Sequence, residues 1–417
     1  MQGAEFSIRQ ALDDRKARRA NRARRRRRAL VQTLAGVFGF AALAAASLVP
    51  DQPPPGAGEQ PRAQWVNLRI PPPVPQPPEA LAAYVDALGR NFQGRAGIAV
   101  RSLEGGWTAA HDAEGLYPQQ SVSKLWVALS VLDAVDRQVI RLDDPVLVRR
   151  QDLSIFHQPI RDFVGPRGFA TSVDELLESA TTKSDNAAND VLMRLVGGPE
   201  AVRAVIAEKE LGAIGLADEE RYFQTQIAGL EWREQFSFGR TFWRARSAMP
   251  QAERRAALEA YLAEPPDGAT PVAVVEALER LHRGELLSPE STELLLTHLG
   301  ASRTGPNRLG GGLAEGWTLA HKTGTGQVMG PLATGYNDVG LLTAPDGATY
   351  AVAVMIAETT ATIPERQALM QAVTRAVIAS HDGLDPAAPP SDDFEFTPYA
   401  ADQETAELDL RPKLSRR

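Results

Sequence analysis

The sequence contains no cysteine among its 417 residues. Disulfide bonds, thiolate zinc sites, catalytic thiols and a lipid-modified cysteine are therefore excluded. An oxidising compartment is not excluded, because a body of about 300 residues buries about 75% of its unfolded surface and needs no covalent staple. Hydrophobic residues make up 43% of the chain, which is enough for such a core.

Histidine is also scarce, and its positions are scattered. The six histidines form neither His-x-His nor His-Glu-x-x-His, the second being a spacing that brings two imidazoles to one zinc ion. No serine lies in Gly-x-Ser-x-Gly, so the nucleophile turn of the α/β-hydrolases is absent. We therefore expect no metal and no cofactor. His321 is interpreted as structural, because on a strand it faces the opposite side from Lys322.

The net charge of −7 conceals a basic N-terminus. Residues 1–28 are strongly basic, and residues 29–49 carry no charge. This order predicts a cytoplasmic segment followed by a signal peptide or signal anchor, and Ala44 to Ala46 fit a signal-peptidase site. A nucleic-acid-binding arm before a core helix is the alternative, which the unbroken apolarity disfavours. We expect an exported, periplasmic or otherwise extracytoplasmic protein without a nucleic-acid partner, anchored to the inner membrane if the segment stays uncleaved.

Composition also separates a linker and a tail from a folded body. Residues 50–78 are crowded with proline and predict an extended spacer. Residues 385–417 are acidic and proline-rich and predict a disordered tail. Residues 79–384 carry the periodic patterns of one catalytic domain, which we expect to be a monomer.

Within that body, strand-like patterns at both ends enclose a helical middle. A helix is expected from Glu79 and another over 364–380. Strands are expected over 96–101, 107–111, 317–325, 338–342 and 350–356, and two further helices over 230–248 and 251–262. This order predicts an α+β sandwich in which helices flank one antiparallel sheet.

The tetrapeptide from Ser121 to Lys124 precedes an apolar run that predicts a central, buried helix. Ser121 would lie at its first turn, where free N–H groups and the helix dipole favour developing negative charge. Lys124, three residues on, faces the same way and can serve as the serine's general base. Taken alone, the tetrapeptide fits better a capping serine and a lysine that reaches solvent.

A second motif, Ser184-Asp185-Asn186, lies at the expected start of another helix. Ser184 can relay a proton to a leaving nitrogen, and Asn186 can bind both a lysine and a substrate amide. Read alone, the triplet is an ordinary helix-capping cluster.

A third motif, Lys322-Thr323-Gly324, lies on an expected strand and is followed by Thr325. Lys322 would supply a fixed positive charge for a substrate carboxylate, and Gly324 would let a substrate backbone approach the strand. The N–H of Thr325 would pair with that of Ser121 as an oxyanion hole. Alone, this segment fits equally an edge strand that ends in a glycine turn.

Together the three motifs occur in one order, each in the secondary structure that its chemistry requires. In this respect the chain resembles the class A β-lactamases from about Glu79 to Gly383. Shorter matches are Thr181 to Lys183, Gly197 to Pro199, Thr270-Pro271, Gly284 to Pro289, Gly316-Trp317 and Asn337-Asp338. The resemblance implies a five-stranded antiparallel sheet beside an all-helical half, with the active site between them.

The resemblance also implies a role for each motif residue. Ser121 would be the nucleophile, Lys124 its base and Ser184 the proton relay. The substrate-binding residues would be Asn186, Lys322, Thr323, Gly324 and Thr325. Arg308 resembles an arginine that some class A members use on the substrate carboxylate, and it fits a solvated loop arginine equally well.

The sequence departs from the family where the deacylating base is expected. Class A enzymes carry Glu-x-x-Leu-Asn between the second and third motifs, and this pentapeptide is absent. Its distance from the second motif points to Glu220, with Glu219 as the alternative; Glu231 and Glu234 are further candidates. The stretch over 221–268 is also much longer than the family's loop.

Three functions stay open at this point. The first is hydrolysis of β-lactams through an acyl-enzyme on Ser121. The second is a D,D-peptidase or transpeptidase that acts on D-alanyl peptides of the cell wall with the same acylation machinery. The third is a non-catalytic envelope scaffold, which the serine–lysine pair disfavours.

Overall fold

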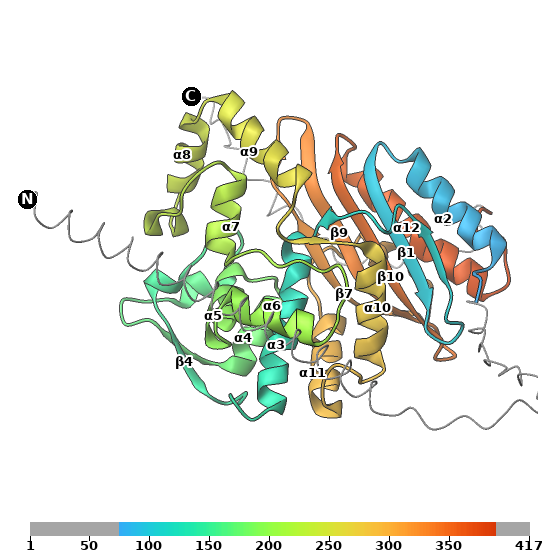
Figure 1. The fold of residues 1–417 in the computed structure, drawn as a ribbon, viewed down its shortest axis with the longest axis horizontal. Helices are drawn as coiled ribbons and strands as arrows, with labels where there is room; N and C mark the ends of the chain where they lie inside the picture. Colours follow the sequence, from blue (N-terminus) through green and yellow to red (C-terminus); the bar gives the residue numbers. More distant parts are fainter. Residues whose placement is uncertain (1–74, 389–417) are drawn as a thin grey trace, which may run out of the picture. The chain divides into compact units, whose positions relative to one another are not determined.

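A computed structural model of the chain describes residues 75–388 (Figure 1). The predicted basic segment 1–28, the apolar segment 29–49, most of the linker 50–78 and most of the tail 385–417 lie outside the described residues. Within 75–388, no helix has the combination of length and apolarity that crossing a membrane requires.

An antiparallel sheet forms the centre of the described body. Its main strands follow the order β2-β1-β10-β9-β7, and the short β8 pairs with β9. Their bounds are Thr108–His111 (β2), Gly94–Ser102 (β1), Thr349–Thr359 (β10), Leu332–Thr343 (β9), Thr318–Thr325 (β7) and Val328–Met329 (β8). Because β1 pairs with β10, strands from both ends of the body build one sheet, and the predicted fold is confirmed.

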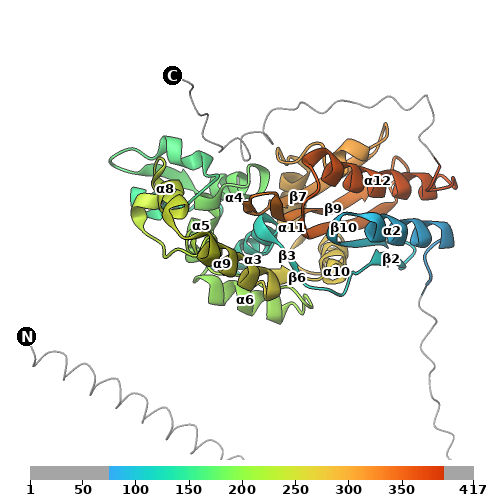
Figure 2. The same cartoon turned by 90° about the horizontal axis from the view of Figure 1, so that it is seen from above.

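Two helices cover one face of this sheet (Figures 1 and 2). They are α2, Glu79–Asn91, and α12, Ile363–His381. Ile98 and Val100 of β1 pack into this layer with Leu81 of α2, whereas Ala99 between them joins the opposite core. The alternation follows from the strand geometry, in which successive side chains point to opposite faces.

Helices on the other face connect the sheet to the helical half. α10, Pro271–His282, contacts β1 and β10, and α11, Pro289–Gly300, contacts β7. The helical half surrounds α3, Lys124–Asp136, with α4, Val173–Thr182, α5, Asn186–Leu195, and α6, Pro199–Glu208. Every side chain from Lys124 to Asp133 is buried, so the prediction of a central helix is confirmed.

Small paired segments complete this half. The hairpin of β4, Pro145–Val148, and β5, Phe169–Ser172, lies in the helical half. The pair of β3, Tyr117–Pro118, and β6, Gly268–Ala269, joins the segment before Ser121 to the end of the long stretch 221–268.

The predicted helix over 230–248 is wrong in its first half. Only Thr241–Ala248 (α8) is α-helical; a 3₁₀ turn, η4, occupies Glu234–Ser237. Phe238 is extended and Gly239 has φ +59°, so the chain turns before α8 begins.

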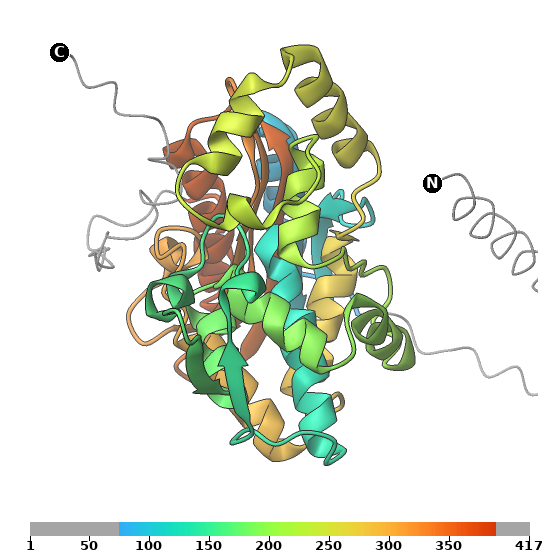
Figure 3. The same cartoon turned by 90° about the vertical axis from the view of Figure 1, so that its left-hand side faces the viewer.

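The second predicted helix of this stretch is confirmed as α9, Gln251–Ala263, and a further helix, α7, Glu220–Ile227, was not expected. The segment from α7 to α9 lies together at one end of the helical half (Figures 1 and 3).

Candidate active site

Four elements bring the sequence motifs together. Ser121 lies on the 3₁₀ turn η1, Gln120–Ser123, which leads directly into α3. The Ser184 motif precedes α5, and the Lys322 motif lies on β7. Since β7 contacts η1, and α5 contacts both α3 and α7, the three motifs meet where the sheet adjoins the helical half.

Ser121 and Lys124 form the pair that the first motif predicts. Lys124 Nζ donates to Ser121 Oγ at 2.9 Å. Lys124 is fully buried, whereas Ser121 is half-buried, so the hydroxyl is accessible and its partner is not. The first turn is 3₁₀ rather than α-helical, and Gln120 before the serine has φ +53°. A left-handed backbone costs a residue other than glycine about 1–3 kcal/mol and is common at active sites.

The fold distinguishes between the two adjacent glutamates. Glu220 begins α7, is 4% exposed and contacts Lys124 Nζ through Oε1. Glu219 instead contacts Arg194 and Arg221. Glu231 and Glu234 are exposed. Of the glutamates considered, Glu220 is the one in contact with Lys124.

Asp190 fixes the start of the Glu220 helix. Its carboxylate accepts the backbone N–H of Glu220 at 2.7 Å and that of Arg221 at 3.2 Å, which caps α7 from the neighbouring α5. Ser154 Oγ donates to the same carboxylate at 2.8 Å. Burial raises the pKa of Asp190 to about 7, and the charges of Glu220 and Glu219 act in the same direction.

The motif search missed Gln224. Gln224 Nε2 donates to Glu220 Oε2 at 3.1 Å and to Gln120 Oε1 at 2.9 Å. Residues four apart on a helix share a face, and the same spacing separates Glu from Asn in Glu-x-x-Leu-Asn. A search that allowed phenylalanine in the place of leucine and glutamine in the place of asparagine would have found Glu220 and Gln224, with Phe223 before the glutamine.

The second and third motifs meet directly. Lys322 Nζ donates to Ser184 Oγ at 2.9 Å, and both side chains are buried. Ser184 has φ +60°, a second left-handed residue at this site. Asp185 accepts the N–H of Ala188 at 3.0 Å and caps α5, and burial raises its pKa.

Asn186 makes hydrogen bonds to the loop that contains Ile155 and His157. Its Nδ2 donates to the Ile155 carbonyl at 2.9 Å, and its backbone N–H donates to the His157 carbonyl at 2.9 Å. His157 Nε2 lies 2.8 Å from the Lys183 carbonyl. The bonds of Asn186 are therefore with this loop.

Gly324 allows a close approach between two parts of the protein itself. A Cβ at this position would lie 2.2 Å from the Gln119 carbonyl oxygen. The glycine therefore lets the strand approach the backbone ahead of Ser121. Asn337 Nδ2 donates to that same carbonyl at 3.0 Å, so β9 holds this approach in place.

Arg308 is not the solvated loop arginine that the sequence allowed. It is 2% exposed, and its guanidinium lies 3.9 Å from the centroid of the Tyr336 ring. Nη1 donates to the Gly324 carbonyl at 3.0 Å, and Nη2 donates to Thr325 Oγ1 at 2.6 Å. The positive charge of Arg308 therefore lies next to the strand of the third motif.

Two further residues of this strand, Thr323 and His321, have protein partners. Thr323 Oγ1 lies 2.6 Å from Thr304 Oγ1. His321 Nδ1 lies 2.8 Å from Asp338 Oδ1 and is buried, which agrees with the structural interpretation of this histidine.

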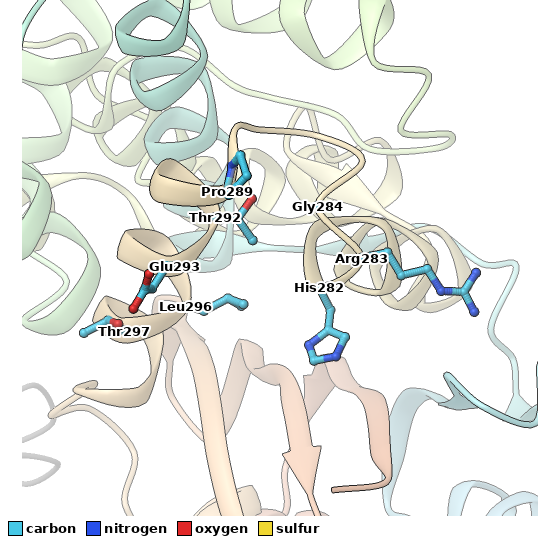
Figure 4. A pocket seen from close by; sticks show the side chains of 8 residues that line it. All are labelled: His282, Arg283, Gly284, Pro289, Thr292, Glu293, Leu296 and Thr297. Atoms are coloured by element: carbon cyan, nitrogen blue, oxygen red, sulfur yellow. The ribbon is translucent and has the colours of Figure 1, made fainter.

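A separate cavity of about 670 Å³ lies between the end of α10 and the part of α11 from Pro289 to Thr297 (Figure 4). Its lining includes His282, Pro289 and Thr292. Asp136, the last residue of α3, accepts the Ser288 N–H beside it at 2.8 Å. The cavity is therefore at the opposite end of α3 from Ser121, a distance of about 20 Å along a helix of this length.

Comparisons with known proteins agree with this geometry. A family model described as "Beta-lactamase enzyme family" matches residues 80–380. Beta-lactamase VEB-1 of Pseudomonas aeruginosa is 27% identical over 244 residues, 58% of this chain and 70% of that protein. The extended-spectrum beta-lactamase PER-1 of Pseudomonas aeruginosa is 28% identical over 262 residues, 62% and 73% of the two chains.

Solved structures give the same answer. A beta-lactamase from Chitinophaga pinensis superposes with a TM-score of 0.60 at 27% identity, covering 72% of this chain and 99% of that one. A variant of the last common ancestor of Gram-negative bacteria class A beta-lactamase superposes with a TM-score of 0.59 at 28% identity, covering 73% of this chain and 99% of that one.

Proposed function

The chain belongs to the β-lactamase enzyme family, in its class A branch, and from that membership we propose that it opens the β-lactam ring through an acyl-enzyme on Ser121. The observation that carries the proposal is the contact of Lys124 with both Ser121 and Glu220. One buried amine thus links the candidate nucleophile to the candidate base for hydrolysis.

Acylation uses the serine–lysine pair. Lys124 Nζ, at 2.9 Å, takes the proton of Ser121 Oγ, and the oxygen attacks the lactam carbonyl carbon. The N–H groups of Ser121 and Thr325 stabilise the negative charge on the carbonyl oxygen. As the C–N bond breaks, Ser184 gives its hydroxyl proton to the ring nitrogen and receives in exchange the proton that Lys124 took from Ser121, which leaves Lys124 neutral again.

Substrate binding relies on the charges of the third motif. Lys322 lies 2.9 Å from Ser184 Oγ and supplies the positive charge for the substrate carboxylate. Arg308, bonded to Thr325 Oγ1, adds a second positive charge behind the same strand. Thr323, Gly324 and Asn186 complete the substrate-binding group as residues that shape the strand and the facing loop.

Deacylation needs a base for water, and Glu220 is the candidate. A positioned general base is typically worth about 10²–10⁴-fold in rate. Gln224 orients the carboxylate by donating to its Oε2 at 3.1 Å. This arrangement favours hydrolysis over the peptidase alternative, in which fast release of a β-lactam acyl group is not required.

Nitrocefin hydrolysis together with intact-protein mass spectrometry tests this function. We expect steady turnover of nitrocefin and, with a slow penicillin, an added mass on Ser121. Ser121→Ala should remove both signals and keep the fold. Undiminished labelling of the alanine variant would place the nucleophile elsewhere, and an acyl-enzyme of the natural sequence that persists for hours would favour the peptidase.

We also propose that the enzyme is exported and works as a monomer outside the cytoplasm, held by residues 29–49 if these stay uncleaved. The basic block before the apolar run supports export. A reporter that is active only in the periplasm, fused after residue 60, should give signal. Light scattering of the purified body should give the mass of one chain, and a dimer mass would contradict the monomer.

A further inference from the structure

A buried string of side chains connects the long stretch 221–268 to the proposed site. Tyr261 OH donates to Asp267 Oδ1 at 3.0 Å, and Gln120 Nε2 donates to that hydroxyl oxygen. Gln120 Oε1 accepts from Gln224 Nε2 at 2.9 Å, and the same Nε2 donates to Glu220 Oε2 at 3.1 Å. The string therefore ends on the candidate base.

The string is inaccessible to water. Tyr261 on α9 is 6% exposed, and Asp267 after α9 is 0% exposed. Gln120 and Gln224 are 1% and 5% exposed. The Tyr261 ring packs edge-on against Phe223 of α7 at 5.6 Å between centroids. A hydrogen bond lost in this environment is not replaced by solvent, so each link matters more than it would at the surface.

The donors and acceptors run in one direction. Burial and the nearby Asp267 charge raise the pKa of Tyr261 well above its ordinary value, so its hydroxyl stays protonated and donates to the carboxylate. Its oxygen then accepts from the amide nitrogen of Gln120, which turns the amide oxygen of Gln120 toward Gln224. Gln224 can only donate to a carboxylate. The Tyr261 hydroxyl therefore sets the orientation of the Gln120 amide, which in turn accepts from the amide nitrogen of Gln224.

Asp267 also holds the backbone beside the nucleophile. The backbone N–H of Gln120 donates to Asp267 Oδ2 at 2.7 Å, and Gln120 has φ +53°. Such a conformation persists only where surrounding bonds determine it. Gln327 extends the support, because its Nε2 donates to the Gln224 carbonyl at 2.8 Å.

We propose that Tyr261 and Asp267 are positioning residues for deacylation, supplied by the long stretch 221–268, which set the orientation of Glu220 through Gln120 and Gln224. The proposal rests on the proposed function, because it needs a Glu220 that activates water. Tyr261 touches neither Ser121 nor Lys124 through the bonds described, so it acts through the two amides.

Tyr261→Phe is the test, since it removes one hydroxyl and retains the ring. We expect the deacylation rate constant of a penicillin acyl-enzyme to fall about tenfold, the order of one buried hydrogen bond. Acylation should change by less than about threefold, because the bond from Lys124 to Ser121 does not pass through the tyrosine. Tyr222→Phe, on the same helix as Glu220 but 39% exposed, is the matched control and should leave both rate constants within about twofold.

A double-mutant cycle separates positioning from general loosening of the fold. In a Glu220→Gln background, Tyr261→Phe should cause no further fall in the deacylation rate constant, because the base that activates water is already removed. A tenfold fall that persists in that background would overturn the proposal, and so would deacylation of the single variant at the wild-type rate.

A second measurement needs no substrate. The side-chain amide protons of Gln120, observed by NMR, should exchange slowly with solvent in the wild type and much faster in Tyr261→Phe. Unchanged exchange would overturn the proposal. Failure of the proposed function, seen as undiminished labelling of Ser121→Ala, would leave this measurement valid, so the two failures are distinguishable.

Discussion

Glu220→Gln isolates the chemical step that the sequence left open. The substitution keeps the size of the side chain and an oxygen that can accept from Gln224. It removes the carboxylate that can take a proton from water and that contacts Lys124. Because Glu220 is 4% exposed, bulk water cannot easily supply another base in its place.

The expected effect is large and confined to one step. Loss of a positioned general base should slow deacylation by about 10²–10⁴-fold, which corresponds to about 2.7–5.4 kcal/mol of barrier. Acylation should fall by less than about tenfold, the order of one hydrogen bond, because Lys124 remains 2.9 Å from Ser121 Oγ. The variant should therefore accumulate acyl-enzyme.

Stopped-flow nitrocefin hydrolysis measures the two steps together. The wild type should turn over steadily, whereas the variant should release one equivalent in a burst and then slow, with the adduct visible by mass spectrometry. Glu219→Gln is the matched control. Its carboxylate contacts Arg194 and Arg221, so turnover should stay within about fivefold, the order of one net hydrogen bond.

Two outcomes would refute this reasoning. Steady turnover of Glu220→Gln at the wild-type rate would show that another group activates water. A larger loss of turnover in Glu219→Gln than in Glu220→Gln would assign the role to the other glutamate.

Three further predictions concern Lys322, Gly324 and the buried Asp267. Lys322→Ala should lower acylation efficiency by about 10–10²-fold, the order of one charged hydrogen bond, and an unchanged kcat/KM for acylation would contradict its role beside Ser184. Gly324→Ala should lower the free energy of unfolding by about 1–3 kcal/mol through overpacking, since its methyl would lie 2.2 Å from the Gln119 carbonyl; urea denaturation measures this, and a neutral result would contradict the close approach. Burial raises the pKa of Asp267 to about 7, so its ionisation lowers the free energy of unfolding as pH rises from about 4 to about 7. Asp267→Asn should remove up to roughly 4 kcal/mol of that pH dependence. An equal change of the free energy of unfolding with pH in the two proteins, measured by urea denaturation, would contradict it.

Short-range sequence patterns were enough to predict the fold class and the three motifs of the candidate site. The Ser121 motif is recognisable because serine and lysine three residues apart share one helical face, which needs no other part of the chain. The strands of the C-terminal half are recognisable as short, mainly apolar runs separated by the turn residues 345–347. Both faces of β9 and β10 are buried, so these strands do not alternate between polar and apolar residues. The structure brings the three motifs together as the sequence order implied.

The long stretch 221–268 was less predictable. Residues 230–240 continue a helical composition, yet η4 and Gly239 interrupt it. Phe236 and Phe242 pack with Ile155 from a distant loop, and this burial outweighs helix propensity, which is worth under about 1 kcal/mol per residue.

The sequence by itself indicated the candidate nucleophile, its lysine and the family, because each depends on residue types at short spacing. Only the tertiary structure decided between Glu219 and Glu220, which are adjacent in the chain. Glu220 lies in the first turn of α7, and its side chain contacts Lys124. The carboxylate of Asp190, on α5, caps this turn by accepting the backbone N–H of Glu220. A contact between helices depends on how the whole chain packs, and the distance from the second motif left both glutamates open.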